Sequence, residues 1–268
     1  MARSAGIVKE SDDRNHPIDL SLSSERAKPE RLPGVRLEPG QTLPADRKYA
    51  IENGPSGFDP AAPSYLPKSR FLMLMRDERL ATLATRYDDA TNTLVINGEG
   101  RELARGDLST PEGRLAIEAF FRRFMPSGLR GPPKVLQSEG HSFSDVSAKV
   151  VSIINLASVA AVENLVGVPV HPLRFRANLY VEGWPAWHES DLVGQEIAIG
   201  GARLKVTKRI VRCAAINVDP ATGMRDLEIP TTLMRTFDHA DCGIYAKVIA
   251  PGDVSPGAEV SVLDSRGA

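Results

Sequence analysis

The stretch Ile197-Ala-Ile-Gly-Gly-Ala-Arg-Leu-Lys-Val-Thr-Lys-Arg-Ile-Val-Arg-Cys213 contains two alternating runs around a pair of glycines. Apolar and polar residues that alternate with a period of two are typical of a half-buried β-strand. Gly200 and Gly201 supply the backbone freedom that a tight turn needs. The stretch therefore predicts a β-hairpin, and its second strand leads directly into Cys213.

The run 174–181 also alternates between polar and apolar residues. A regular strand there places Arg174, Arg176 and Asn178 on one face. A polar face of this kind is most often the solvated outer side of a strand. Arginine forks with a neighbouring amide can also bind a phosphate or the edge of a pterin ring, so both interpretations stay open.

Further runs predict a protein with many short strands. We expect 244–248 to pair with 260–263, and 80–87 to form a hairpin with 93–96. Two short strands are also expected at 35–37 and 48–51. Short strands at this spacing are typical of a barrel or a sandwich.

Two helices have clear boundaries in the sequence. Thr110 followed by Pro111 is typical of an N-cap and the first helical position. The residues that follow place an apolar stripe at helical spacing, which indicates core packing: Ile117, Phe120, Phe121 and Phe124. A second helix is expected from an N-cap at Asn155 to a C-cap at Gly167.

The composition indicates an ordinary globular protein of one large or two smaller domains. Of 268 residues, 42% are hydrophobic and 25% are charged. A formal net charge of -1 gives no reason to expect nucleic acid binding. The first residues lack the apolar core of a secretory signal, and the longest apolar stretch, 150–162, is too short for a membrane span. With two cysteines, expected as reduced thiols, we predict a cytoplasmic protein.

Cys213 stands beside Arg212 at the end of the predicted hairpin. Adjacent positive charge favours the thiolate, which is the form that attacks electrophiles or binds a soft metal. A cysteine in an apolar run is, however, more often a small buried hydrophobe. The residues alone favour that second interpretation.

Other candidate sites are weaker. The segment 140–144 approaches the Gly-x-Ser-x-Gly elbow of serine hydrolases but lacks the final glycine. His239, Asp241 and Cys242 are metal-ligand types without a second ligand pair at zinc spacing, and we expect a loop there. The aromatic segment 184–188 could line a substrate pocket, but packing at the rim of a barrel is the more common role.

Several motifs together resemble the MOSC domain, the C-terminal module of molybdenum cofactor sulfurases. This domain also occurs in free-standing bacterial proteins and in the mitochondrial amidoxime-reducing component. The resemblance extends from about residue 32 to residue 263, and four elements carry it in the family's order: Asp46-Arg47-Lys-Tyr49, Phe175-Arg176-Ala-Asn178, Arg212-Cys213 with Val218-Asp219-Pro-Ala-Thr-Gly223, and Gly243-Ile-Tyr245-Ala.

The resemblance implies a mainly β (α+β) fold with a few helices. It places a MOSC β-barrel at 136–266 and a smaller MOSC-associated domain of mixed β structure at 32–135, with the cofactor between them. Residues 1–31 are polar and are expected to be mostly a flexible tail.

The resemblance also implies a site for the molybdenum cofactor, with Cys213 as the metal ligand and catalytic centre. Asp219 then lies just past the metal, where a catalytic role and a turn-forming role are equally open. Cofactor contacts carry over onto Arg47, Ser147, Arg176, Asn178, Arg212 and Tyr245. Arg212 and Cys213 can serve one cofactor only if the strand ends or bulges near residue 212.

One element departs from the family pattern. The family's opening strand carries a lysine that meets the cofactor phosphate, whereas the nearest match here is His16-Pro-Ile-Asp19. Lys68 is a candidate to supply the missing charge from elsewhere.

The leading hypothesis is a molybdenum-dependent oxidoreductase that reduces small N-hydroxylated compounds. An external flavin, haem or iron–sulfur protein has to donate the electrons, because the sequence has no motif for such a group. The rival hypothesis is a carrier that holds a persulfide or the cofactor on Cys213. A binding protein with an inactive site is a third possibility. The pyridoxal phosphate domain of larger sulfurases has no counterpart here, so we expect no pyridoxal phosphate.

Overall fold

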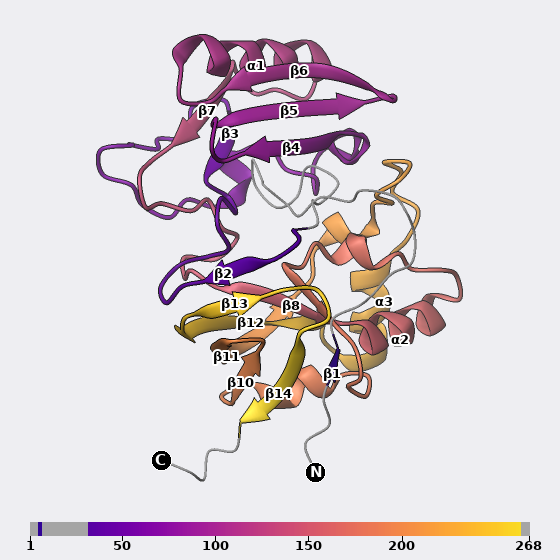
Figure 1. The fold of residues 1–268 in the computed structure, drawn as a ribbon. Coiled ribbons are helices and arrows are strands. Elements are labelled where there is room, and N and C mark those ends of the chain that lie inside the picture. The colour runs from indigo at the N-terminus through magenta and orange to yellow at the C-terminus, as the bar shows by residue number, and fades with distance from the viewer. Residues whose placement is uncertain (1–4, 7–31, 264–268) are drawn as a thin grey trace.

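The structure is a computed structural model that describes residues 5–6 and 32–263. The described part is mainly β with three α-helices, as the sequence predicts. Figure 1 shows an N-terminal part that lies above a C-terminal part. Of the expected tail, the structure describes Ala5–Gly6, which form a two-residue strand, β1. The rest of that expectation, including the His16–Asp19 segment, lies outside the described residues.

A seven-stranded sheet forms the C-terminal part and curls around one apolar core (Figure 1). Its neighbours are antiparallel except for one parallel pair, the last two strands of the order. The order is β1, β14 (Glu259–Leu263), β10 (Glu196–Ile199), β11 (Ala202–Val211), β12 (Asp241–Ala250), β8 (Val151–Asn155) and β9 (Leu179–Val181).

The predicted hairpin at 197–210 is confirmed as β10 and β11, with Ile199 opposite Ala202. Gly200 turns the chain with a φ of 55°. This left-handed conformation costs glycine little because it has no Cβ atom.

The expected pairing of 244–248 with 260–263 is wrong. β12 pairs with β11 and β8, whereas β14 pairs with β10 and β1. Between them the chain forms β13 (Gly252–Val254), which pairs with β2 (Val35–Leu37) instead of making a simple hairpin turn. Gly252 passes so close to the backbone of Gly201 that a Cβ atom there would overlap it. This crossing sends β14 to the far side of β10.

The expected strand at 174–181 is confirmed only at β9. Pro172–Phe175 form a 3-10 helix, η3, and Arg176 follows in the left-handed region with a φ of 50°. The side chain of His171 caps this turn by accepting a hydrogen bond from the Leu173 amide at 3.2 Å. The cap and the helix-starting proline outweigh the alternating pattern in this segment.

The N-terminal part combines a three-stranded sheet, a two-stranded sheet and one helix. The first sheet is β4 (Ala84–Asp88), β5 (Thr93–Gly98) and β6 (Arg101–Asp107), and the second is β3 (Tyr49–Asn53) with β7 (Pro133–Gln137). The expected strand at 80–87 begins later, because Asp77 caps a 3-10 helix, η2 (Glu78–Thr82), by accepting from the Arg79 amide.

The first predicted helix is confirmed as α1 (Pro111–Phe124). The Thr110 hydroxyl accepts a hydrogen bond from the Gly113 amide at 3.1 Å. Ile117 and the phenylalanine stripe pack into the N-terminal core, with Phe124 at its edge.

The second predicted helix is confirmed as α2 (Leu156–Val166), capped by the side chain of Asn155 and by a left-handed Gly167. A third helix, α3 (Ile229–Phe237), is absent from the prediction. Its proline in the first turn was the signal that could have revealed it. None of the helices in the described ranges combines the length and apolar character of a membrane-spanning helix.

The two parts share apolar clusters. Ala215 and Val218, which follow Cys213 in the C-terminal part, belong to the apolar cluster of the N-terminal part, and Leu37 and Leu43 belong to the cluster of the C-terminal sheet. The chain after β11 is therefore held between the two halves of the molecule.

Candidate functional site

Cys213 lies where β11 has ended. The strand stops at Val211 after a register shift, so the predicted strand end near residue 212 is confirmed. Cys213 occupies the N-cap position of a short 3-10 helix, η5 (Ala214–Asn217), without a capping hydrogen bond from its side chain, and is half-buried against the N-terminal core. The chain leaves the sheet here, which lets the thiol face residues from the other half of the protein.

The amino group of Lys68 is that partner. Its Nζ lies 3.4 Å from the Cys213 Sγ, across 145 residues of sequence. Lys68 starts η1 (Lys68–Arg70) in the proline-rich connection of the N-terminal part. An ammonium group at this distance favours a thiolate over a thiol.

Tyr245 of β12 lies close enough to several predicted site residues to interact with their charges. Burial raises the pKa of its phenol, and the negative charge of Asp145 adds to that rise. The charges of Arg47, Arg212 and Lys68 act on the pKa in the opposite direction. The net shift is upward, so Tyr245 keeps its proton beside a group of cations.

Arg47 is held in place by a buried ion pair. Its Nη1 donates to Oδ2 of Asp46 at 2.5 Å, and both side chains are almost fully buried. The left-handed backbone of Arg47, with a φ of 55°, is uncommon for a residue with a long side chain. Such a conformation persists only where the surroundings fix it.

Asn178 helps to fix this backbone conformation of Arg47. Its Nδ2 donates to Asp46 Oδ2 at 3.3 Å, and its Oδ1 accepts from the Ser152 amide and hydroxyl at 2.9 and 2.7 Å. The side chain thus links β8 to the Asp46–Arg47 pair from a buried position. The predicted direct contact of Asn178 with a cofactor stays a prediction.

Arg212 points its guanidinium at backbone carbonyls. Its Nε donates to the Cys242 oxygen at 2.6 Å, and its Nη1 donates to the Phe175 oxygen at 2.8 Å. The Nη2 atom is buried and has no hydrogen-bond partner among the described residues. Arg176, almost fully buried, follows Phe175 directly. Arg212 therefore joins the Phe-Arg-x-Asn segment to the start of β12.

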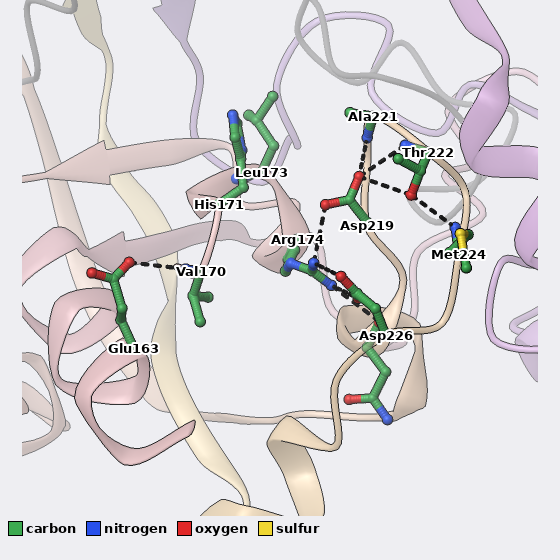
Figure 2. A network of polar contacts seen from close by, with 11 residues as sticks. Glu163, Val170, His171, Leu173, Arg174, Asp219, Ala221, Thr222, Met224 and Asp226 are labelled. Carbon is green, nitrogen blue, oxygen red and sulfur yellow. Dashed lines mark hydrogen bonds and ion pairs between the residues drawn. The ribbon is translucent and has the colours of Figure 1, made fainter. Parts of the chain in front are cut away.

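Arg174 contradicts the expectation of a solvated outer face. It is 3% exposed and donates to Asp226 at 2.8 Å and to Asp219 at 3.1 Å (Figure 2). Its Nη1 also donates to the Asn217 carbonyl at 3.0 Å. The 3-10 turn, which replaces the expected strand, aims Arg174 inward at the segment that follows Cys213.

Asp219 forms the turn on that segment. Its Oδ1 accepts from the amides of Ala221 and Thr222 at 2.7 and 2.8 Å (Figure 2). Burial raises its pKa, but these amides and the charge of Arg174 outweigh burial, so the net pKa is lowered. Asp219 is thus a carboxylate at neutral pH, and these contacts serve the turn. Its predicted catalytic role stays a prediction.

Ser147 is exposed in the loop before β8, and its predicted cofactor contact stays a prediction as well. Cys242 is buried within β12, and burial raises the pKa of its thiol to about 12. In the described ranges, no three side chains of His, Cys, Asp or Glu gather as a metal site, so the zinc interpretation of 239–242 gains no support.

The predictions from the sequence missed two contacts that matter for the site. Lys68 was a candidate for a phosphate contact, which stays a prediction, and the structure places its ammonium group at the thiol. Arg174 organises the segment after Cys213, although its alternating position suggested solvent. The His171-Pro172 pair, a capping side chain before a proline, was the available signal for Arg174. For Lys68 the sequence contains no comparable signal.

The sequence profile of the MOSC domain matches residues 138–261. The matched part is somewhat less than half of the chain and includes Arg174, Cys213 and Tyr245. No curated protein matches the chain.

Several solved structures are similar. YiiM from Geobacillus stearothermophilus has 19% identity and a TM-score of 0.35, over 42% of this chain and 54% of that protein. The alignment thus spans about half the length of that relative. The YuaD protein from Bacillus subtilis has 14% identity and a TM-score of 0.45, over 98% and 97% of the two chains. YiiM from Escherichia coli has 19% identity and a TM-score of 0.32, over 44% and 56%.

Proposed function

We propose that this protein binds a molybdenum cofactor through the Cys213 thiolate and reduces small N-hydroxylated compounds. The observation that carries the proposal is the 3.4 Å contact between the Lys68 ammonium and the Cys213 sulfur at the junction of the two halves. The motif order from Asp46 to Tyr245 and the match of residues 138–261 to the MOSC domain support it.

The residues present fit this group by their chemistry. Cys213 offers one soft anionic ligand, and molybdenum prefers thiolates. Lys68, Arg47 and Arg212 offer positive charge for an anionic cofactor, and all three act on Tyr245. The buried Nη2 of Arg212 has no hydrogen-bond acceptor among the described residues, so it is available to donate to a bound group. When bound, the cofactor supplies two-electron redox chemistry at the metal.

The overall reaction balances with two electrons and two protons. The N–O bond of R–NH–OH breaks, the nitrogen gains hydrogen to give R–NH₂, and the oxygen leaves as water. Tyr245 is protonated at neutral pH, as an ordinary phenol is, and burial raises its pKa further, so it can donate a hydrogen bond to the substrate oxygen. Lys68 holds the sulfur as a thiolate, and Asn178 orients Asp46 and, through it, Arg47.

Turnover with a small chemical donor tests the proposal. Protein made in a cofactor-competent host is assayed for reduction of benzamidoxime with reduced methyl viologen. We expect wild-type protein and a Cys242→Ser control to turn over, and Cys213→Ser to lose the activity by at least about 100-fold. Equal activity of the two cysteine variants would contradict the proposal.

The carrier function is the second candidate, because the Lys68–Cys213 contact also suits a persulfide anion. Mass spectrometry of the intact protein separates the two. A mass increase of one sulfur on Cys213 in molybdenum-free protein, with no turnover of benzamidoxime, supports the carrier and rejects the oxidoreductase.

A further inference from the structure

The residues that follow η5 form a small hairpin at the junction of the two halves. The Asp219 amide donates to the Met224 oxygen at 2.7 Å. Val218 and Arg225 face each other as an isolated antiparallel bridge. We call residues 217–226 the junction hairpin. Its backbone contacts make Arg225 part of a closed turn.

The junction hairpin is fixed to the C-terminal half by one side chain. Buried Arg174 donates to Asp219 at 3.1 Å and to Asp226 at 2.8 Å (Figure 2). It also donates to the Asn217 carbonyl at 3.0 Å. These contacts all lie within the C-terminal half, so another residue has to join the hairpin to the half that carries Lys68.

The guanidinium of Arg225 makes that connection. Its Nη1 donates to the oxygen of Ala214, the residue after Cys213, at 2.6 Å. Its Nη2 donates to the Met75 oxygen at 3.3 Å and lies 3.5 Å from Oε2 of Glu78. A planar guanidinium holds two acceptors at once in a fixed geometry. Arg225 therefore fixes the backbone beside Cys213 to a segment of the N-terminal half.

Lys68 lies on the same segment of the N-terminal half. The Leu72 amide donates to the Ile51 oxygen of β3 at 2.9 Å, which ties the stretch 68–75 to the N-terminal sheet. The Nζ of Lys68 reaches the Cys213 sulfur at 3.4 Å from one end of this stretch. The contacts of the arginine and the lysine–sulfur contact therefore join the same two segments of chain.

The junction hairpin also packs closely against η2. Gly223 has a φ of 70°, and a Cβ atom there would lie 2.7 Å from Cγ2 of Thr82 and 3.3 Å from the Glu78 oxygen. The turn that carries Arg225 is thus in direct contact with the N-terminal half. Lys68 itself has a flexible four-carbon stem, so it needs its surroundings to keep it at one place.

We propose that Arg225 is a positioning residue that holds the Lys68 ammonium group against the Cys213 sulfur. The inference rests on the proposed function, in which this contact prepares the metal ligand. Arg225 contacts the backbone beside the sulfur and acts on the sulfur through Lys68. The apolar cluster that the two halves share does not depend on Arg225, so we expect a variant to fold while the lysine–sulfur distance becomes variable.

The reagent o-phthalaldehyde measures this contact, because it condenses with one amine and one thiol that lie side by side. The product is a fluorescent isoindole, and two water molecules leave. We expect the full chain, made without the cofactor, to form the isoindole between Lys68 and Cys213, and Lys68→Met and Cys213→Ser to form none. Arg225→Met should form it at least about fivefold more slowly, because the rate depends on how well the two groups are held together.

Arg79→Met is the matched control, since Arg79 pairs with Asp77 at 2.9 Å inside the N-terminal half. Glu78→Gln removes the ion pair of Arg225 and leaves both of its carbonyl contacts. We expect both controls to form the isoindole within about twofold of the wild-type rate. Protection of Cys242 from alkylation checks that each variant is folded. Arg225→Gln, which keeps an amide donor without the fork, repeats the comparison if the methionine variant exposes Cys242.

Isoindole formation at the wild-type rate in Arg225→Met, an equal loss in Arg79→Met or Glu78→Gln, or no isoindole in wild type would overturn the proposal. Viologen-driven reduction of benzamidoxime separates it from the proposed function. If both are right, Arg225→Met reduces benzamidoxime more slowly than Arg79→Met. Slow isoindole formation in Arg225→Met with no turnover in wild type would reject the function and leave the positioning role standing. Turnover in wild type, with isoindole formation unchanged in Arg225→Met, would reject the positioning role alone.

Discussion

The two cysteines are close in the fold and opposite in environment. Val211, at the end of β11, is the register partner of Asp241, at the start of β12, so Cys213 and Cys242 lie near the same end of these two neighbouring strands. Cys242 sits inside its strand, buried in apolar surroundings. Cys213 lies beyond its strand, half-buried and in contact with Lys68. Whether a cysteine lies inside its strand or beyond the strand end therefore decides which of the two thiols is reactive.

Alkylation rates provide the strongest test of this difference between the two thiols. At pH 8 a thiol with a pKa of about 12 is only about 0.01% ionised, so Cys242 should be almost inert. We expect iodoacetamide to modify Cys213 in the native protein at least about 100 times faster than Cys242. Peptide mass spectrometry measures both rates, and denatured protein, in which both should react, serves as the control. Comparable native rates would contradict the comparison.

Arg174→Ala should loosen the segment that follows Cys213 while leaving Cys242 protected. Removing the arginine leaves Asp219 and Asp226 without their cation, and the Asn217 carbonyl keeps only the donor that the Asp226 amide provides. We expect a loss of about 2 to 3 kcal/mol in the free energy of unfolding, measured in urea. Asp226→Asn should cost less, because the Asp219 contact remains. A loss below about 0.5 kcal/mol for Arg174→Ala would mean that the network does not hold the segment.

Lys68→Met should slow alkylation of Cys213 by about five- to tenfold, because one charge near the sulfur contributes on the order of 1 kcal/mol. Lys68→Arg keeps the charge and should retain most of the rate. The rate at Cys242 in denatured protein should not change in either variant. A Lys68→Met protein with wild-type alkylation would show that the ammonium does not stabilise the thiolate.

The smallest expected effect is the pH dependence of the Asp219 turn. Because the folded-state pKa of Asp219 is lowered, its stabilisation is fully present above the unfolded-state pKa and is lost as pH falls through the folded-state pKa. Asp219→Asn should therefore be less stable than wild type at pH 7, by at most about 1 kcal/mol, with the gap closing toward pH 3. Urea unfolding of both proteins across this range measures it. A stability difference between the two proteins that does not change with pH would contradict the lowered pKa of Asp219.

Local sequence signals predicted the local structure. The caps at Thr110 and Asn155 and the glycine pair at 200–201 were sufficient for two helices and the hairpin. The strand end beside Cys213 was predicted from the family resemblance, which implies that Arg212 and Cys213 serve one cofactor.

Long-range relations were harder to predict. The pairing of β14 with β10 depends on a crossing at Gly252, which alternation does not encode. The contact of Lys68 with Cys213 joins residues 145 positions apart, and only the packing of the two halves creates it. Arg174 was misplaced because a capped 3-10 turn and a strand present its side chain to opposite surroundings.

Metal content tests the central claim most directly. Wild type, Cys213→Ser and Cys242→Ser are purified from a cofactor-competent host and analysed for molybdenum by mass spectrometry. We predict about one molybdenum per chain in wild type and in Cys242→Ser, since one thiolate ligand serves one metal, and a near-complete loss in Cys213→Ser. Molybdenum retained by folded Cys213→Ser, or missing from wild type, would contradict the assignment of Cys213 as the ligand.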